Sequence, residues 1–240
     1  MVDPALAAPG GRLLLRPAAE RFHSQLDWLD SWHSFSFAGH QDPAWMGFGP
    51  LRVINDDTIA AGAGFGMHPH RDMEILTVMV EGVLQHRDSL GHTQELLAGE
   101  LQWMSAGTGV VHSEINAGSQ SCRLLQIWIE PQCLGLTPSY AQQPMSLGPS
   151  WTLLLDPDGQ AGAIAIHRPV RLWRACPRAG EVLPIPVASD RAGWLQMIEG
   201  ALSAPLLLRR GDGLGFQSGG LSAPLQVGDE GADLLLFELA

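Results

Sequence analysis

The sequence has no lysine, only three cysteines and no long apolar run, and each shortage narrows the class of protein. Its basic residues are 14 arginines against 25 acidic residues, for a formal net charge of −11. This composition argues against direct binding of nucleic acid, which needs clustered basic side chains. The cysteines form no C-x-x-C pair, which argues against a disulfide framework. With no signal-peptide pattern and no membrane-length apolar segment, we expect a cytoplasmic protein that binds no membrane.

Long segments with the helical period of 3.6 residues are also scarce. Glycine (28 residues) and proline (17 residues) divide the chain into short apolar runs, a pattern that favours β-barrels or sandwiches. The expected strands are 51–54, 75–80, 83–87, 94–97, 124–129, 151–155, 163–167, 194–198 and 234–239. One modest helix is expected to open at Thr137 and Pro138, since threonine can cap a helix and proline suits its first turn. It lies in a Pro/Gln-rich stretch, 131–150, interpreted as the link between two domains, 1–135 and 136–240.

Two short segments each carry a pair of metal-binding side chains. His68 and His70 form one pair, and His112 and Glu114 form the other. In a β-strand, residues two apart point to the same face with roughly 7 Å between their Cα atoms, so two such pairs on facing strands can converge on one ion. Three imidazoles and a carboxylate suit a first-row transition metal better than calcium or magnesium.

The spacing around these pairs resembles the two-part motif of the cupins. The matching positions are Gly62, His68, His70, Glu74, Gly82, Gly99, Gly107, His112 and Asn116. Ser105 departs from the pattern, because cupins usually have proline there, and one extra residue precedes the third histidine. In cupins the fourth ligand usually corresponds to Glu74, whereas this chain has a second carboxylate at Glu114.

The displaced carboxylate is a feature of the pirin branch of the cupins, which the sequence resembles along most of its length. The segments that carry the resemblance are 29–38 (LDSWHSFSFA), 49–57 (GPLRVINDD), 66–74 (GMHPHRDME) and 105–114 (SAGTGVVHSE). The match is close to the bacterial pirin-like quercetinases. It implies an all-β bicupin of two jelly-roll-like barrels. The implied ligands of one divalent transition metal are His68, His70, His112 and Glu114. Fe(II) is the expected metal, with Ni, Mn, Co, Cu or Zn as alternatives, and Glu74 keeps a supporting or structural role.

The second half of the chain looks like an eroded copy of the first. The echoed segments are 80–84 (VEGVL) with 198–202 (IEGAL), and 97–101 (LAGEL) with 209–213 (RRGDG). Alignment of Gly200 on Gly82 puts Pro186 and Ala188 where the first two histidines stand. Because no histidine follows residue 167, we expect the C-terminal barrel to be degenerate and to lack the metal.

Two functions follow from the resemblance. The first is an oxygenase, since pirin-like bacterial proteins are similar to quercetin 2,3-dioxygenases, which open the heterocycle of a flavonol with O2 and release carbon monoxide. A small planar aromatic substrate is then expected, with Glu114 as the catalytic base that takes the proton of the flavonol hydroxyl. The second is a non-enzymatic regulator, because eukaryotic pirins are nuclear cofactors of transcription factors that bind other proteins. We favour the enzyme and expect a monomer.

Other candidate residues are weighed by position. A metallo-β-lactamase-like site is set aside, because Met73 stands where its H-x-H-x-D-H motif needs a histidine and the chain offers almost no helices. The pocket candidates nearest the ligands are Phe65, Met67, Met73, Trp103 and Met104. The aromatic residues between 28 and 48 can form a wall or lid over the site, although burial is the commoner fate of such residues. His33 and His40 are interpreted as packing residues, His92 as a turn residue, and His86 stays ambiguous.

Overall fold

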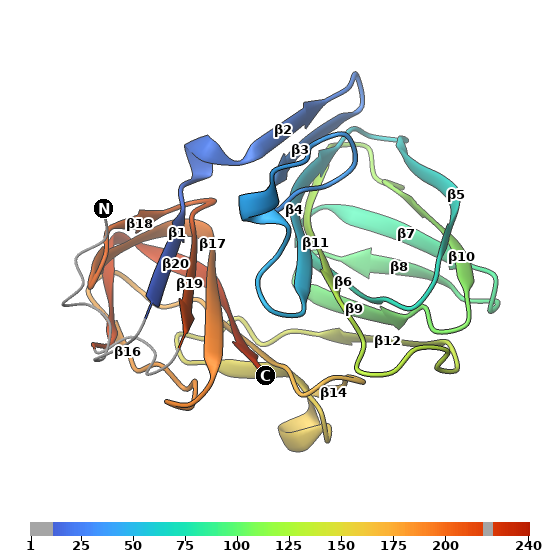
Figure 1. Cartoon of the computed structure of the whole chain (residues 1–240). Helices are drawn as coiled ribbons and strands as arrows, with labels where there is room; N and C mark the ends of the chain where they lie inside the picture. Colours follow the sequence, from blue (N-terminus) through green and yellow to red (C-terminus); the bar gives the residue numbers. More distant parts are fainter. Residues whose placement is uncertain (1–11, 218–222) are drawn as a thin grey trace. The chain divides into compact units, whose positions relative to one another are not determined.

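Figure 1 shows the computed structural model of the chain, which describes residues 12–217 and 223–240. The chain is built almost entirely of antiparallel strands, so the expected all-β class is confirmed. The helices of the described residues are three short 3-10 turns, η2 (Ala18–Glu20), η3 (Pro43–Trp45) and η4 (Gln160–Gly162). None of them has the length and apolar character needed to cross a membrane.

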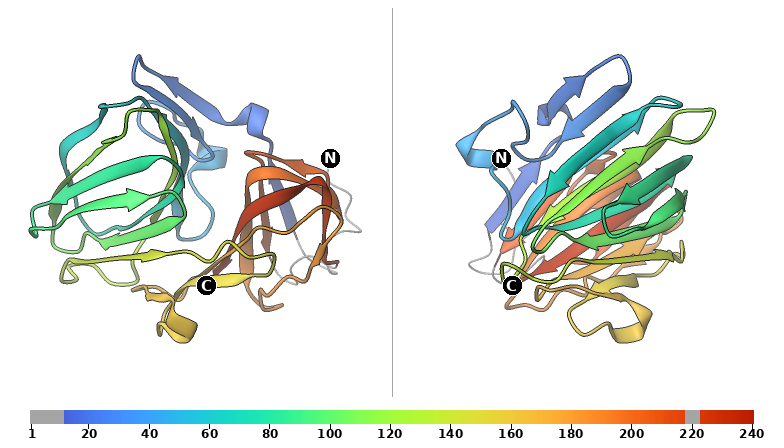
Figure 2. Two further views of the ribbon diagram at one scale, coloured as in Figure 1. Left: turned by 180° about the vertical axis from the view of Figure 1, so that it is seen from behind. Right: turned by 90° about the vertical axis from the view of Figure 1, so that its right-hand side faces the viewer.

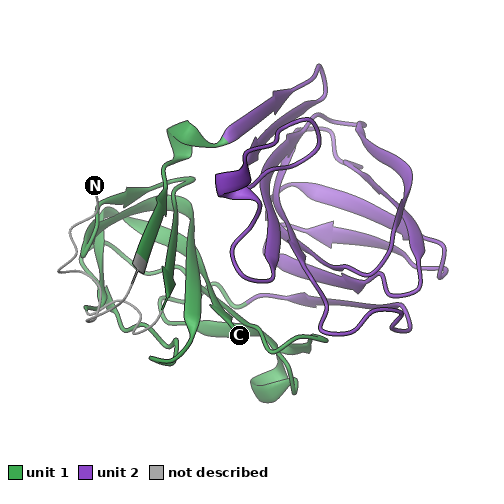
Figure 3. Cartoon of the chain, in the orientation of Figure 1, with its two compact units in different colours: residues 1–21, 146–240 green, residues 22–145 purple. Residues whose placement is uncertain are grey.

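The chain divides into two compact units, which Figure 3 colours separately. Unit 2 is Phe22–Met145, and unit 1 combines the described residues of Met1–Arg21 and Ser146–Ala240. This division differs from the expected domains at both ends. β12 (Ser139–Pro144) pairs with β9 (Glu100–Ser105) of unit 2. β1 (Arg12–Arg16) pairs with β19 (Gly213–Gln217) of unit 1, so the start of the described chain belongs with its C-terminal part.

The helix expected at Thr137 is not formed, and that prediction was wrong. Residues 139–144 are the edge strand β12 instead. Tyr140 lies opposite Met104 in the register, and its hydroxyl lies 2.9 Å from the side-chain oxygen of Gln142 and 3.3 Å from that of Gln102. Backbone and side-chain bonds to β9 therefore take the place of the bonds within a helix that the local sequence would favour.

Unit 2 is a barrel made of two antiparallel sheets that curve around one interior (Figures 1 and 2). The strands not yet given are β2 (Phe22–Gln25), β3 (Leu29–His33), β4 (Leu51–Ile59), β5 (Gly64–His70), β6 (Glu74–Glu81), β7 (Val83–Asp88), β8 (Thr93–Leu97), β10 (Val110–Ile115) and β11 (Cys122–Ile129). One sheet has the order β12-β9-β6-β11-β4-β3-β2 and the other β5-β10-β7-β8. Both sheets contribute to an apolar cluster at one end, composed of Leu29, Ile59, Met79, Leu84, Leu96, Cys122 and Leu124. This cluster closes the barrel on one side and leaves the interior beside β5 and β10 for a site.

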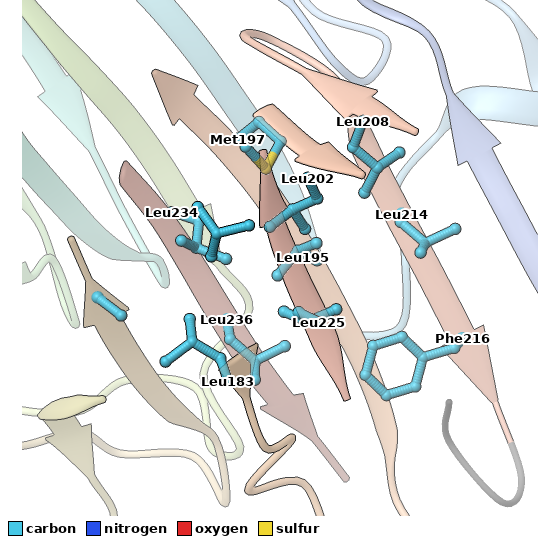
Figure 4. Close-up of a cluster of buried hydrophobic side chains, with 12 residues drawn as sticks. Leu183, Leu195, Met197, Leu202, Leu208, Leu214, Phe216, Leu225, Leu234 and Leu236 are labelled. Atoms are coloured by element: carbon cyan, nitrogen blue, oxygen red, sulfur yellow. The ribbon is translucent and has the colours of Figure 1, made fainter. Parts of the chain in front are cut away.

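Unit 1 contains a third sheet, of nine strands among the described residues. Its other strands are β13 (Thr152–Asp156), β14 (Ile164–Ala165), β15 (Arg171–Ala175), β16 (Val182–Leu183), β17 (Ala192–Ala204), β18 (Leu208–Arg209) and β20 (Leu225–Leu239). The main path is β1-β19-β17-β20-β15-β13-β14. Figure 4 shows Leu195, Met197, Leu214, Phe216 and Leu234 packed together with seven further buried apolar side chains of this sheet. A single apolar cluster thus holds the strands of this unit together.

Candidate metal centre

The predicted pairs lie on neighbouring strands of one sheet. β10 pairs with β5 in antiparallel register, with Val110 opposite His70 and His112 opposite His68. The two histidines of β5 point to the same face because they are two residues apart. His112 joins them from the adjacent strand, so strand pairing alone brings the three imidazoles together.

A β-bulge interrupts the pairing of β5 with β10. The register shifts between His112 and Glu114, and Glu114 lies opposite Phe65. Without the shift Phe65 and His68, three residues apart, would point to opposite faces of the sheet. The bulge directs both side chains into the same cavity, which is a common use of bulges near functional sites.

The three imidazoles form a compact group. The ring centroid of His68 lies 4.8 Å from that of His70 and 4.4 Å from that of His112, and the centroids of His70 and His112 are 4.8 Å apart. One ligating nitrogen from each ring lies within 4.8 Å of the other two, and this is the one such group of three or more among the described residues. This donor set suits a transition metal.

The protonation of the rings also fits a metal. The carbonyl oxygen of Gly66 accepts a hydrogen bond from Nδ1 of His68 at 2.7 Å, which leaves Nε2 with a lone pair for a metal. His112 is fully buried, and neither of its ring nitrogens has a hydrogen-bond partner. Such an orphaned imidazole is costly in a folded protein unless it binds something, and a metal ion would satisfy it. Burial, together with the neighbouring imidazoles, lowers the pKa of His70 to about 4 and that of His112 to about 3. Both rings are therefore in the neutral form that ligates metals.

Glu114 lines the same cavity but lies outside the compact group of imidazoles. Gln126 Nε2 donates to both of its carboxylate oxygens, at 3.1 and 2.9 Å. The hydroxyl of Thr77 lies 3.2 Å from one of these oxygens and 2.9 Å from the side-chain oxygen of Gln126. These groups come from the opposite sheet and fix the orientation of the carboxylate. The role of Glu114 as fourth ligand stays a prediction.

Glu74 lies in a different environment. Its carboxylate is fully buried and accepts hydrogen bonds from Trp103 Nε1 at 2.7 Å and from the Ser105 hydroxyl at 2.9 Å, both on the neighbouring strand β9. These bonds tie β6 to β9. Glu74, which the general cupin pattern would make a metal ligand, thus forms hydrogen bonds that connect two strands.

A cavity of about 360 Å³ opens between the two sheets of unit 2. Its apolar wall is made of Leu26, Leu29, Phe37, Phe65 and Trp128. Of the pocket candidates chosen from the sequence, Phe65 lines the cavity, whereas Met67 is 60% exposed on the outside of the strand. Met73, Trp103 and Met104 are not lining residues either, because their side chains belong to the packing around β6 and β9. Phe37, one of the aromatic residues for which a wall over the site was the alternative to burial, lines the cavity.

Sequence reasoning missed the polar wall of this cavity, which is formed by Ser24, Ser31, His33, Asn55 and Asp57. Their strands pair directly, with Ser31 opposite Asp57 and His33 opposite Asn55. His33 therefore does more than pack. The signal that could have found this wall is the spacing of two between Ser31 and His33 and between Asn55 and Asp57, the same alternation that identified the metal pairs.

Asp57 is the most perturbed carboxyl group of this wall. Burial raises its pKa to about 7, against the effect of the hydrogen bond from Ser31. The negative charges of Asp56 and Glu114 add to the increase. Asp56 itself points to the other face of the sheet, where Arg123 binds both of its oxygens at 2.8 and 3.0 Å.

The ambiguous His86 lies beside the centre, on the neighbouring strand β7 opposite Glu114. It is fully buried, its ring centroid lies 5.3 Å from that of His112, and its Nε2 bonds to Asp88 at 3.0 Å. His92, expected to be a turn residue, bonds to the same carboxylate at 2.8 Å and stacks on Tyr140. His86 and Asp88 flank the ligand strand β10 from β7, on the edge opposite β5.

Comparison with known proteins places this geometry in a family. Residues 16–129 match the Pirin family, and residues 153–239 match a Quercetinase C-terminal cupin domain. A protein named quercetin 2,3-dioxygenase from Escherichia coli (strain K12) is 47% identical over 189 residues, which are 78% of this chain and 82% of that protein. A putative quercetin 2,3-dioxygenase from Pasteurella multocida is 42% identical over 95% of this chain and 99% of that protein. The crystal structure of a bacterial pirin from Escherichia coli in complex with nickel(II) superposes with a TM-score of 0.89 at 43% identity, covering 95% of this chain and 99% of that chain.

Proposed function

Because this chain belongs to the pirin family of cupin proteins, we propose that it is a metal-dependent dioxygenase that opens the heterocycle of flavonols such as quercetin with O2. The observation that carries the proposal is the group of three imidazoles beside a cavity with a wall of aromatic and aliphatic side chains. Cavities that bind small molecules are typically about 300 to 1,000 Å³ and mostly apolar. The names of the relatives from Escherichia coli and Pasteurella multocida supply the substrate class.

The proposed ligands are His68, His70 and His112, with Glu114 completing the set. Fe(II) is the proposed resident metal, although nickel, manganese, cobalt, copper and zinc also fit three imidazoles and a carboxylate. When bound, a divalent metal would acidify a coordinated hydroxyl group and leave positions open for the substrate and O2.

Glu114 is the proposed base for the substrate hydroxyl. The two hydrogen bonds from Gln126 Nε2 hold its oxygens in place at the cavity. A carboxylate positioned in this way can accept a proton without first reorienting.

The apolar wall has a separate task, which is to bind and orient the rings. Phe37 and Trp128 pack edge to face, with centroids 5.5 Å apart, and Phe65 is braced in the same manner by Trp28 at 5.1 Å. Aromatic faces held in this way can enclose a planar substrate and exclude water from it.

The test is to measure quercetin consumption and O2 uptake by protein loaded with each of the six metals in turn. With at least one metal we expect quercetin and O2 to be consumed together. A His68→Ala/His70→Ala double variant should consume neither. No O2 uptake with any of the metals at full occupancy would overturn the enzyme and leave a non-enzymatic regulator as the alternative.

A further inference from the structure

A continuous chain of hydrogen bonds leads from the cavity to its outer rim. The Ser31 hydroxyl donates to Asp57 Oδ1 and lies 3.3 Å from Nδ1 of His33. On the other side of this ring, Nε2 of His33 lies 2.8 Å from the hydroxyl of Ser24. The same hydroxyl lies 3.1 Å from Nε2 of His40. Five side chains, from β2, β3, β4 and the loop between β3 and β4, are therefore linked in series.

The hydrogens of this chain can be ordered in one direction. The side-chain oxygen of Asn55 lies 2.8 Å from Nδ1 of His33 and can only accept, so Nδ1 carries the hydrogen. Nε2 of His33 is then the acceptor, and it takes the single hydroxyl hydrogen of Ser24. Ser24 must in turn accept from Nε2 of His40. The Nδ1 hydrogen of His33 is directed at Asn55 and has Ser31 within reach at 3.3 Å, and the other hydrogens between His40 and Asp57 point inward.

The two ends of the chain have different surroundings. Asp57 is 2% exposed and lines the cavity, on the sheet that faces the three imidazoles. His40 is only half-buried, and its ring packs against Phe22 at a centroid distance of 5.5 Å. The charged groups around Asp57 are Asp56, which is bound by Arg123 on the far face of the sheet, and Glu114 on β10. Asp57 therefore faces the ligand cavity, and His40 can exchange protons with solvent.

We propose that Asp57, Ser31, His33, Ser24 and His40 form a proton relay through which the cavity exchanges one proton with solvent while a ligand fills it. The ligand class is that of the proposed function, a hydroxylated planar aromatic molecule, and the proposal rests on that function in this respect. Asp57 is the inner end, which exchanges a proton with an oxygen of the ligand. His33 and the two serines are positioning residues that act through it.

The steps of the relay balance without a redox partner. In the inward direction, Ser24 passes its hydrogen to Nε2 of His33 and receives one from His40. His33 passes its Nδ1 hydrogen to Ser31, whose own hydrogen moves to the Asp57 carboxylate. Solvent protonates Nδ1 of His40 as its Nε2 hydrogen leaves, so the net change is one proton gained by Asp57 and one taken from solvent. The reverse sequence leaves Asp57 as a carboxylate that can accept the proton of a ligand hydroxyl.

Glu114 and Asp57 then have complementary tasks. Glu114 accepts the proton of the hydroxyl nearest the imidazoles, whereas Asp57 sets the proton content of a closed cavity from the opposite sheet. A second carboxyl group that is half-ionised near neutral pH suits this exchange, because it can hold or release a proton with little cost.

The first test needs no substrate. In zinc-loaded protein, which is diamagnetic, the ring signals of His33 are followed by NMR across pH 5 to 9. We expect them to report a titration that disappears in Asp57→Asn, because Asp57 and His33 share Ser31. The bound cation opposes the effect of Glu114, so the midpoint should lie below that of metal-free protein. His33 signals that titrate identically in both proteins would overturn the relay.

The second test breaks the relay at its outer half. Quercetin is mixed with metal-loaded protein without oxygen, in weak buffer with a pH indicator, and ligand absorbance and proton release are followed together. In Ser24→Ala, proton release after quercetin has bound should be at least about 10-fold slower than in wild type, a conservative share of what acid–base groups contribute. Ser24→Thr keeps the hydroxyl and should restore the rate.

Ser36→Ala is the matched control, because the Ser36 hydroxyl bonds only locally to the backbone of Asp42 and lies outside the chain of bonds. It should behave as wild type. Proton release from Ser24→Ala at the wild-type rate would overturn the relay. If wild-type protein fails to bind quercetin at all, the proposed substrate is wrong, and the NMR titration still decides whether the relay exists.

Discussion

His112 lies directly opposite His68 in the antiparallel pairing of β10 with β5, and their ring centroids are 4.4 Å apart. His70 completes the group from the same strand as His68. The geometry of the centre therefore depends on one strand pair, in which each strand is held by backbone hydrogen bonds before any metal binds. A pre-formed group of this kind loses its metal when one imidazole is removed, but it does not lose its fold.

The first prediction is that one metal binds per chain, in unit 2. Replacement of His68 or His112 by alanine should reduce bound metal from one equivalent to near zero, because two imidazoles cannot make up for the third. His167→Ala, an exposed histidine of unit 1, is the matched control and should keep the metal. Metal content and thermal unfolding measured together would check it. Two equivalents per chain, or metal retained in the His68→Ala/His70→Ala double variant, would contradict it.

The sequence predicted the repeat that underlies the two units. Gly82 and Gly200, aligned by the echoed segments, both adopt positive φ angles, of 77° and 70°. The amide of Gly99 donates to the carbonyl of Met79, and the amide of Gly211 donates to that of Met197, each at 3.1 Å. Positive φ and a tight turn demand glycine, so these positions persist where the side chains around them have changed. Turn chemistry is local and can be read from a sequence.

The polar wall could not be predicted in the same way. Ser31, His33 and Asp57 are unremarkable as residues, because isolated polar side chains on a strand usually face water. Their burial follows from the sheet order, which places β3 and β4 across from the imidazoles. Sheet order depends on contacts between distant parts of the chain. The expected helix near Thr137 failed for the same reason, since pairing with β9 decides its structure.

A second prediction concerns stability and pH in metal-free protein. The pKa values of His70 and His112 are lowered in the folded state, so the unfolded chain binds more protons below pH 6.5 and stability falls as the pH falls toward 4. The pKa of Asp57 is raised to about 7 from 3.8, so its contribution has the opposite sign and is lost as the pH rises through 7. The two effects partly cancel between pH 4.5 and 6.5.

Asp57→Asn should remove the opposing contribution. The rise of the unfolding free energy with pH should then steepen by up to about 1.4 kcal/mol per pH unit, the limit for one proton. Denaturant unfolding at several pH values would measure the slope, with Asp27→Asn, an exposed carboxylate, as the control. An unchanged slope in Asp57→Asn would show that Asp57 is ionised in the folded state at these pH values.

The third prediction distinguishes Glu74 from a ligand. Both of its oxygens accept hydrogen bonds from β9, so in Glu74→Gln an amide nitrogen must face either Trp103 Nε1 or the Ser105 hydroxyl. An unsatisfied buried donor costs about 1 to 3 kcal/mol of stability. The metal content should stay close to one equivalent. Denaturation and metal analysis separate the two effects, and a loss of metal as complete as in His70→Ala would make Glu74 a ligand.

The last prediction tests Glu114 as base through what a carboxylate can do and its amide cannot. Glutamine still offers an oxygen, so Glu114→Gln should bind metal more weakly without losing it, since three imidazoles remain. Only the carboxylate can accept the substrate's proton. Loss of a positioned base costs about 10² to 10⁴-fold in rate, and a hydroxyl acidified by a cation argues for the lower end.

The defect of Glu114→Gln should also shrink as the pH rises, because solvent then takes over the deprotonation. Quercetin consumption and O2 uptake are measured at matched metal content from pH 6 to 9. Thr77→Val is a companion variant, since it removes the hydroxyl that lies 3.2 Å from Glu114 and 2.9 Å from the Gln126 side chain but keeps the carboxylate. Its defect should be smaller than that of Glu114→Gln at low pH. Equal rates for Glu114→Gln and wild type at every pH would remove Glu114 as the base and leave Asp57, the other carboxyl group of the cavity, to take its place.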